Sequence, residues 1–439
     1  MRILEWQTLD EGARRAALAR PEVQSRFEVL RVAQDAIDEV RRLGDVALKS
    51  LAQRFDGFAP GALKVSAEEF AQARGALSPV QTAALERAIA NVRAFHSLQR
   101  PKALQIEIEA GVRLEQIIQP IELVGLYVPA GSAPLPSAVI MLAVPAAVAG
   151  CPIRVLCTPP ARDGQADPAV LVAAELCGID MVFKVGGAQA IAALAYGTET
   201  IPKVDKIFGP GNAWVTAAKQ LVANDPEGAS CDLPAGPSEV MIIADDTARS
   251  NFVAADLLAQ AEHDPLAQAI LVTSSRALAG PVAAVIESAL PQLRRRSILK
   301  QSLSACRCIL VPHLERAFAV ANTYAPEHLL LHVREPRRWL PQVRAAGTVF
   351  LGAWSPEALG DYCTGANHVL PTYGYARSLS GLTVRDFVKT ITVQELSPEG
   401  LLSLAPTAVT LANLEGLDAH AQAVTCRLEA LARSPAWAG

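Results

Sequence analysis

The chain has little that would attach it to nucleic acid or to a membrane. Its 439 residues hold 40 Lys and Arg against 44 Asp and Glu, a formal net charge of -4. No basic surplus is therefore available to neutralise a phosphate backbone. The apolar run 137–153 is too short to span a bilayer and is interrupted by Pro145, Gly150 and Pro152. The N-terminal residues lack the apolar core of a secretory signal. We expect no nucleic-acid partner, no membrane association and a cytoplasmic location.

Disulfide and thiol-metal patterns are also absent. The eight cysteines are scattered without a CxxC pair, and Cys306 and Cys308 fall in a strand-like run. Reduced, mostly buried thiols of a cytosolic protein are the expectation. The densest basic run, 294–296, ends a helix-like stretch and is interpreted as a solvated face.

Short apolar runs alternate with helix-like segments from residue 122 onward. The first series places strands at 122–128, 153–157, 181–185 and 206–208, and helices at 137–149, 168–177, 188–196 and 212–223. The second places strands at 239–245, 269–275, 307–312, 328–333 and 347–352, and helices at 249–262, 281–296 and 315–324. Alternation of this kind predicts parallel sheets covered by helices, with ligands at the carboxyl ends of the strands.

The predicted fold class is α/β, with two doubly wound (Rossmann-like) parallel-sheet domains and small helical N-terminal and C-terminal domains. Long amphipathic helical stretches are expected at 21–55 and 66–99, and a last helix at 417–432. The domain boundaries are placed at 1–23, 24–126 together with 240–381, 127–239, and 382–439.

Histidine is scarce, and four of the seven histidines stand in polar clusters. Gln260 and His263 share AQAEHD near a helix end, where a spacing of three puts both on one face. Glu327 and His328 are adjacent in APEHL, where two bases of different intrinsic pKa suit sequential proton transfers. An ordinary polar helix end and a surface pair before a strand are the alternatives.

Two further clusters offer hard donors. Asp361 lies in GDYCTGANHVLP, a glycine-bracketed loop, and His368 in the same motif is expected to be packed or hydrogen-bonded. Glu415 and His420 close EGLDAH at a helix start, which an ordinary charged helix start would also explain. Separate motifs that carry imidazole, carboxylate and amide groups are what a metal site beside acid–base chemistry requires.

Glycine-rich turns follow two of the predicted strands, at 126–139 and 208–219. Backbone N–H groups at such strand-to-helix turns can hold a pyrophosphate. Neither turn fits GxGxxG, and a tight turn without a ligand would look the same.

Taken together, these motifs resemble those of the histidinol dehydrogenase family. The resemblance is dense from about 123 to 424 and is carried by LYVPAGSAPLPS, KVGGAQAIAALAYGT, KVDKIFGPGN, DLPAGPSEV, DLLAQAEHD, YAPEHL, SPEALGDYCTGANHVLPTYGYAR, TVQEL and EGLDAH. It implies a zinc-dependent, NAD-linked oxidoreductase of histidine biosynthesis, an amino-acid biosynthesis pathway. The reaction implied is the four-electron oxidation of L-histidinol to L-histidine through bound histidinal, with two NAD, water and one zinc ion per site.

The resemblance also implies roles for residues and domains. Zinc ligands would be Gln260, His263, Asp361 and His420; the catalytic pair Glu327 and His328; NAD contacts Tyr127, Gln189 and Asn212; and substrate contacts Ser238, Glu415, His328 and the metal ligands. Residues 24–126 with 240–381 would form the catalytic, metal-side domain and 127–239 the NAD side. Residues 382–439 would cross to the partner of a homodimer, so Glu415 and His420 would complete the other chain's site.

Two alternatives and one departure accompany this interpretation. A family paralogue would oxidise another small alcohol, such as a sulfonated diol, to its acid, and a zinc-binding protein with an inactive site would share the ligands. Ala130 stands where relatives commonly carry a glycine, and alanine would strain the turn if the position needs a positive φ. Manganese or cobalt would fit the same donors as zinc.

Overall fold

A computed structural model describes the whole chain except residues 22–25, 56, 59, 131–132, 235 and 434–439. The chain forms two compact units. The first comprises Met1–Gln99 and Ile121–Phe387, and the second comprises Arg100–Pro120 and Val388–Gly439.

One half of the first unit is built on a six-stranded parallel sheet, sheet A. Its strands run in the order β1 (Arg2–Glu5), β11 (Arg307–Leu310), β10 (Gln268–Thr273), β9 (Glu239–Ala244), β12 (His328–His332) and β13 (Thr348–Leu351). Helices α10 (Ser250–Ala261) and α11 (Arg276–Ala289) pack on one face, and α13 (Leu314–Tyr324) with Trp6 packs on the other. Both faces are covered, so these strands consist of buried apolar runs rather than alternating ones.

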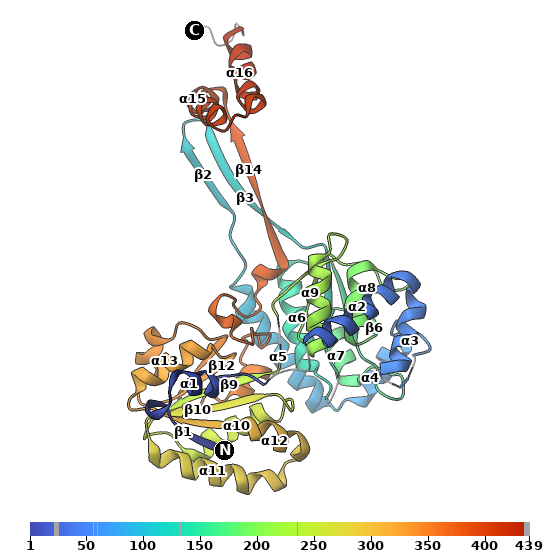
Figure 1. Cartoon of the computed structure of the whole chain (residues 1–439). Helices are drawn as coiled ribbons and strands as arrows, with labels where there is room; N and C mark the ends of the chain where they lie inside the picture. The colour runs from blue at the N-terminus through green and yellow to red at the C-terminus, as the bar shows by residue number, and fades with distance from the viewer. Residues whose placement is uncertain (22–25, 56, 59, 131–132, 235, 434–439) are drawn as a thin grey trace. The chain divides into compact units, whose positions relative to one another are not determined.

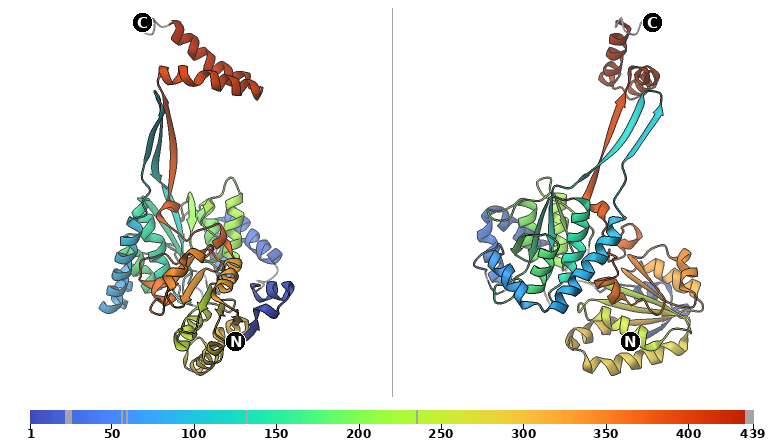
Figure 2. Two further views of the ribbon diagram at one scale, coloured as in Figure 1. Left: turned by 90° about the vertical axis from the view of Figure 1, so that its left-hand side faces the viewer. Right: turned by 180° about the vertical axis from the view of Figure 1, so that it is seen from behind.

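The other half is built on a five-stranded parallel sheet, sheet B. Its order is β6 (Met181–Lys184), β5 (Ile153–Thr158), β4 (Leu123–Tyr127), β7 (Lys206–Phe208) and β8 (Ser230–Cys231). Helices α2 (Arg26–Leu43), α8 (Gly187–Tyr196) and α9 (Ala213–Asn224) share one core with it. Helices α6 (Pro136–Ala149) and α7 (Pro168–Leu176) pack together, and α6 also contacts β4 (Figures 1 and 2).

The strand order gives sheet B a switch point between β4 and β7. From β4 the chain builds outward through β5 and β6, then returns to place β7 and β8 on the other side of β4. The loops that follow β4 and β7 therefore part in opposite directions and leave a crevice at the carboxyl edge. This edge is where a ligand is expected to bind.

The predicted α/β class with two doubly wound parallel sheets is confirmed, and several details differ. Residues 1–23 are not purely helical, because Arg2–Glu5 pairs with β11 as an edge strand before α1 (Glu11–Ala17). Helix α11 begins at Arg276, so Pro281 lies inside it and does not start it. In addition, α2 packs on α8 and α9 beside sheet B, not beside sheet A as the boundary at 24–126 assumed.

Each of the two long helical stretches predicted near the N-terminus is divided into two helices, at residues that favour a helix end or a helix start. Gly44, with φ +54, separates α2 from α3 (Asp45–Phe55). Ser66 and Ser78 form capping boxes with Glu69 and Gln81, so the second stretch divides into α4 (Ala67–Ala76) and α5 (Pro79–Ser97). These helices pack around sheet B.

The second unit contains an antiparallel sheet that the sequence analysis did not predict. Sheet C pairs β2 (Leu104–Glu109) with β3 (Val112–Pro120) and β3 with β14 (Val388–Leu396). Helices α15 (Pro398–Leu414) and α16 (Asp418–Arg433) follow and pack against each other. The predicted C-terminal helical domain is therefore helical only in its last part.

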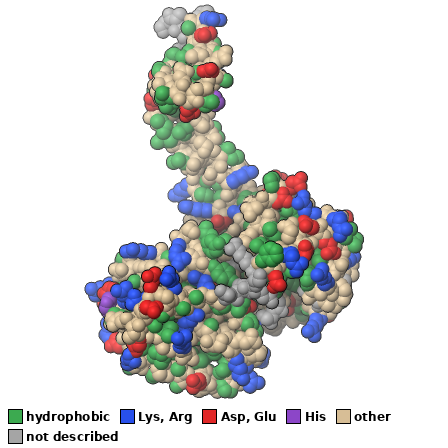
Figure 3. Space-filling model, in the orientation of Figure 1, with side chains coloured by type: hydrophobic (Ala, Val, Ile, Leu, Met, Phe, Trp, Pro, Cys, Tyr) green, Lys and Arg blue, Asp and Glu red, His purple; other side chains and the backbone are tan. Residues whose placement is uncertain are grey.

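Three predictions about class and surface can be checked directly. Within the described residues, no helix is both long enough and apolar enough to cross a membrane. All eight cysteines are free thiols, and Cys306 and Cys308 are buried in and beside β11. On the face that Figure 3 shows, Lys and Arg side chains are interspersed with Asp and Glu.

Candidate active site and cation centre

Glu327 and His328, which we call the Glu–His pair, stand at the start of β12. Helix α13 is followed by its C-cap Ala325, which is in the left-handed conformation with φ 54, and Pro326 then turns the chain into the strand. The backbone N–H of Glu239 donates to Glu327 Oε2 at 2.8 Å, and the Glu239 carbonyl lies 3.1 Å from His328 Nδ1. A carbonyl oxygen only accepts, so Nδ1 carries a proton, and in the neutral imidazole it is Nε2 that presents the lone pair.

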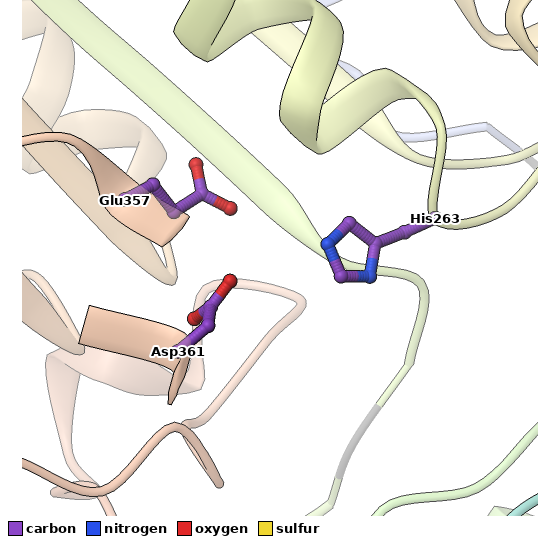
Figure 4. A group of neighbouring side chains, drawn as sticks. All are labelled: His263, Glu357 and Asp361. Carbon is purple, nitrogen blue, oxygen red and sulfur yellow. The ribbon is translucent and has the colours of Figure 1, made fainter. Parts of the chain in front are cut away.

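A second group of side chains faces this pair. His263, Glu357 and Asp361 place one ligand atom each within 4.8 Å of one another, and Figure 4 shows them turned toward a common space. His263 follows the end of α10, while Glu357 and Asp361 lie on α14 (Glu357–Tyr362). Asp361 Oδ1 is also 3.5 Å from His328 Nε2. The pair and the carboxylates therefore form one cluster.

Gln260 adds an amide to the same cavity. Its side chain is fully buried, yet neither Oε1 nor Nε2 makes a hydrogen bond within the described part of the chain. A buried amide without partners is costly, so this side chain is poised for a ligand. Glu357 Oε2 and His328 Nε2 are buried and unsatisfied in the same way.

The electrostatics of the cluster follow from burial and from its excess of carboxylates. Burial raises the pKa of Glu327 to about 8 and raises the pKa of Glu357 well above its usual range. Burial would lower the pKa of His328, but the carboxylates of Glu357 and Glu327 outweigh it and raise that pKa well above 6.5. Burial lowers the pKa of His263, which keeps its imidazole neutral, the form that ligates metals. Three carboxylates around two imidazoles suit a bound cation.

This cluster lies at the amino edge of sheet A, which corrects the expectation that ligands meet the carboxyl ends of the strands. Ser238 precedes β9, and Glu327 precedes β12. Helix α10 runs antiparallel to the strands, so its carboxyl end, with Gln260 and His263, returns to the amino edge. In sheet A, Gln260 and His263 are therefore positioned by the carboxyl end of helix α10 and not by the carboxyl end of a strand.

For sheet B the expectation holds. A cavity of about 1340 Å³ extends from the cluster to the crevice between β4 and β7 and is lined by Tyr127, Gln189 and Asn212 as well as Ser238 and His328. Tyr127 ends β4, and its hydroxyl accepts a hydrogen bond from the Gly187 N–H at 3.1 Å. Asn212 caps α9 through a 3.1 Å bond from the Val215 N–H. All three proposed NAD contacts therefore line the cavity that reaches this switch point.

A buried ion pair fixes the glycine-rich turn after β7. Lys219 Nζ donates to the Gly209 carbonyl at 2.9 Å and pairs with Asp232, whose other oxygen accepts the Gly209 N–H at 2.7 Å. Gly209 has φ +127, and a Cβ there would lie 2.1 Å from the Tyr127 carbonyl. The turn therefore needs glycine. In the other predicted turn, residues 131 and 132 lie outside the described residues.

Glu415 and His420 belong to the second unit. Both are exposed there, Glu415 at the end of α15 and His420 in the first turn of α16. The other predicted donors, Gln260, His263 and Asp361, are all in the first unit. The participation of Glu415 and His420 stays a prediction.

The predictions for His368, Arg295 and Ala130 have different outcomes. His368 is hydrogen-bonded as expected, with Nδ1 2.8 Å from the Asp361 carbonyl. Arg295 is not simply a solvated side chain, because it lines the cavity and donates to the His263 carbonyl at 3.3 Å. Ala130 also lines the cavity, and within the described residues the non-glycine positions with positive φ are Ala325, Glu335 and Tyr373. The strain expected at Ala130 is therefore not seen.

The sequence analysis missed Glu357, although a signal was present. In SPEALGDY, Glu357 and Asp361 are four apart after a proline, the spacing that puts two side chains on one face of a helix. A six-residue helix offered too short a pattern to be recognised, so only the aspartate was singled out.

The fold and the cluster define an α/β enzyme whose ligand cavity spans two doubly wound sheets. Comparison with known proteins then identifies it further. The family model described as histidinol dehydrogenase matches residues 18–428, so the chain belongs to the histidinol dehydrogenase family of oxidoreductases. The histidinol dehydrogenase of Xanthomonas euvesicatoria pv. vesicatoria (strain 85-10) is 53% identical over 429 residues, covering 98% of this chain and 99% of its own.

Two further relatives support the same assignment. The Vibrio vulnificus (strain YJ016) histidinol dehydrogenase is 50% identical over 431 residues, which cover 98% of this chain and 99% of that protein. The crystal structure of histidinol dehydrogenase from Elizabethkingia anophelis matches with a TM-score of 0.93 at 40% identity, covering 98% of both chains. The similarity therefore extends over the whole fold.

Proposed function

We propose that this chain oxidises L-histidinol to L-histidine through bound histidinal, with two NAD and water, as the last steps of histidine biosynthesis. The observation that carries the proposal is the meeting of the Glu–His pair, His263 and Asp361 in one cavity of a chain that belongs to this family. The relatives found do not favour the paralogue that oxidises another alcohol. Eight free thiols support a cytoplasmic setting.

The residues present fit one zinc ion and NAD. Buried, unpartnered Gln260 atoms, a neutral His263 and the Asp361 carboxylate are nitrogen and oxygen donors around one space. The cavity reaches the switch point of sheet B, where Tyr127, Gln189 and Asn212 would meet the dinucleotide. Zinc would orient the substrate, and the nicotinamide would accept hydride.

The Glu–His pair supplies the proton transfers. The Glu239 carbonyl fixes a proton on His328 Nδ1, so in the neutral imidazole Nε2 would be the base for the alcohol proton. In the second oxidation, Glu327 would activate the water that attacks the aldehyde, and His328 again collects a proton. Ser238, at the start of β9, lines the same cavity and would contact the substrate.

The active form is proposed to be a homodimer in which Glu415 and His420 reach the partner's site. Large apolar side chains are exposed in the second unit, among them Ile106, Ile108, Ile391, Leu411 and Leu414, and hydrophobic side chains are visible on it in Figure 3. An exposed apolar surface of this kind suits a subunit interface. His420 then brings a fourth protein donor for zinc.

The test of the proposed function is the number of NADH formed per histidinol consumed. We expect two, with histidine as the product, because both oxidations occur at one site. One NADH with released histidinal would refute the four-electron reaction. No NADH from histidinol but turnover of another alcohol would establish the paralogue, and binding of zinc and NAD with no turnover would establish an inactive binding protein.

If each active site is built from both subunits, two inactive variants should recover activity when their subunits exchange. His263→Ala damages the site of its own chain, whereas His420→Ala damages the partner's. A mixed dimer then keeps one intact site, so random exchange of subunits should restore about a quarter of wild-type activity. The measurement is NADH formation after the two variants are mixed and allowed to exchange. Mixtures that stay inactive although mixed dimers form would show that each chain completes its own site.

A further inference from the structure

The main chain of Glu239 holds both members of the Glu–His pair. Its N–H donates to Glu327 Oε2 at 2.8 Å, and its carbonyl accepts from His328 Nδ1 at 3.1 Å. A single residue at the start of β9 therefore sets the carboxylate position of one side chain and the tautomer of the other. Any shift of Glu239 moves both groups together.

The side chain of Glu239 is itself anchored in the interior. Its carboxylate is only 2% exposed and accepts Arg20 Nε at 2.5 Å and Arg20 Nη2 at 2.8 Å, a two-point ion pair. The Tyr373 N–H adds a third bond at 2.9 Å. The fork of an arginine matches a carboxylate in a way that a lysine does not.

Arg20 also reaches the segment that leads into the Glu–His pair. Its guanidinium lies 4.1 Å from the ring centroid of Tyr324 and donates to the Tyr324 carbonyl at 3.0 Å. Tyr324 ends α13, two residues before Pro326. One arginine thus contacts β9 through Glu239 and the approach to β12 through Tyr324.

We propose that Arg20 and Glu239 are positioning residues that fix the Glu–His pair in its reactive geometry, an inference that rests on the proposed function of that pair. Neither side chain is assigned to touch substrate. The neighbouring backbone has other anchors, because the Ala19 carbonyl accepts from Gln268 and from Arg307, each at 3.2 Å. Loss of Arg20 is therefore compatible with a folded N-terminal segment.

The experiment compares Arg20→Met, Arg20→Lys, Glu239→Gln and the double variant Arg20→Met/Glu239→Gln as zinc-loaded dimers. In Arg20→Met the Glu239 carboxylate is buried without its counter-ion, so kcat should fall about 10²-fold while KM for histidinol and NAD stays near wild type. Arg20→Lys keeps the positive charge but not the two-point geometry of the guanidinium, so its kcat should lie between those of the wild type and Arg20→Met. The double variant should recover part of kcat, because a neutral amide needs no counter-ion.

Arg14→Met is the matched control. Arg14 belongs to the same N-terminal segment and stacks over Trp6 at 5.5 Å, with its Nε bonded to the Trp6 carbonyl. It should lower the melting temperature without changing kcat. A purely structural role for Arg20 would give this same pattern in Arg20→Met, a lower melting temperature with unchanged kcat per zinc-loaded subunit, and would overturn the proposal.

A readout independent of turnover separates this inference from the proposed function. The ¹⁵N resonances of His328, assigned with a His328→Asn variant, should report a proton on Nδ1 in the wild type and its loss or exchange in Arg20→Met. An unchanged tautomer in Arg20→Met overturns the positioning role even if histidinol is not the substrate. A wild-type protein that forms no NADH from histidinol overturns the proposed function alone.

Discussion

Asp361→Asn is expected to leave a folded protein that binds no zinc and loses at least about 10³-fold of its turnover, because the proposed role of the zinc ion is to place the substrate. Asp361 is the residue whose carboxylate faces both His263 and His328, and its pKa is lowered because its contact with His328 outweighs burial. An amide in its place keeps the shape but removes the negative charge that a divalent cation requires. Zinc per subunit and the rate of NADH formation are the measurements.

Two further experiments complete that test: removal of zinc from the wild type with a chelator, and a control substitution at another aspartate. A chelator should abolish turnover of the wild type, and added zinc should restore it. Asp246→Asn is the control, because Asp246 is exposed just beyond the opposite, carboxyl end of β9. It should keep zinc and turnover. Full activity in a zinc-free sample would exclude the proposed role of zinc in orienting the substrate.

The sheets that carry this site could be predicted from sequence because their strands are buried on both faces. Within β9 and β10, the segments 240–244 and 269–272 are continuous apolar runs, which stand out against the helices between them. Sheet C was missed for the opposite reason. Leu104–Glu109 alternates apolar and polar residues, the pattern of an exposed antiparallel strand, but no helix follows to mark it as one unit of a series.

The site itself was predictable only in part. Spacing within one helix was enough to associate Gln260 with His263, and adjacency was enough for the Glu–His pair. Arg20 and Glu239, by contrast, are separated by 219 positions and meet only because the N-terminal segment packs beside β9. Nor does any local pattern show that α10 returns to the amino edge of sheet A, which decides where the donors converge.

Substitutions of the two members of the Glu–His pair should affect the two oxidation steps differently. His328 is proposed to act in both oxidations, so His328→Asn should lower the rates of histidinol and histidinal oxidation alike, by about 10²–10⁴-fold. Glu327 is proposed to activate water in the second oxidation only. Glu327→Gln should therefore slow histidinal oxidation by a similar factor and leave the first hydride transfer much less affected.

The ratio of products makes this difference measurable. In Glu327→Gln the NADH formed per histidinol should fall from two toward one, with histidinal trapped as its hydrazone, whereas in His328→Asn the ratio stays at two and only the rate drops. The amide that replaces the Glu327 carboxylate would still accept the Glu239 N–H through its oxygen, so the geometry of the pair is preserved while its basicity is lost.

A Glu327→Gln enzyme that makes both NADH near the wild-type rate would remove Glu327 from the mechanism. The other two carboxylates of the cluster are not placed to substitute for it. Glu357 lies 3.9 Å from His328 Nδ1, on the side already bonded to the Glu239 carbonyl. Asp361 faces His263 and is the carboxylate proposed to bind the cation. A carboxylate that binds the cation is not free to act as the base for water. Loss of the second oxidation alone is therefore the result that assigns water activation to Glu327.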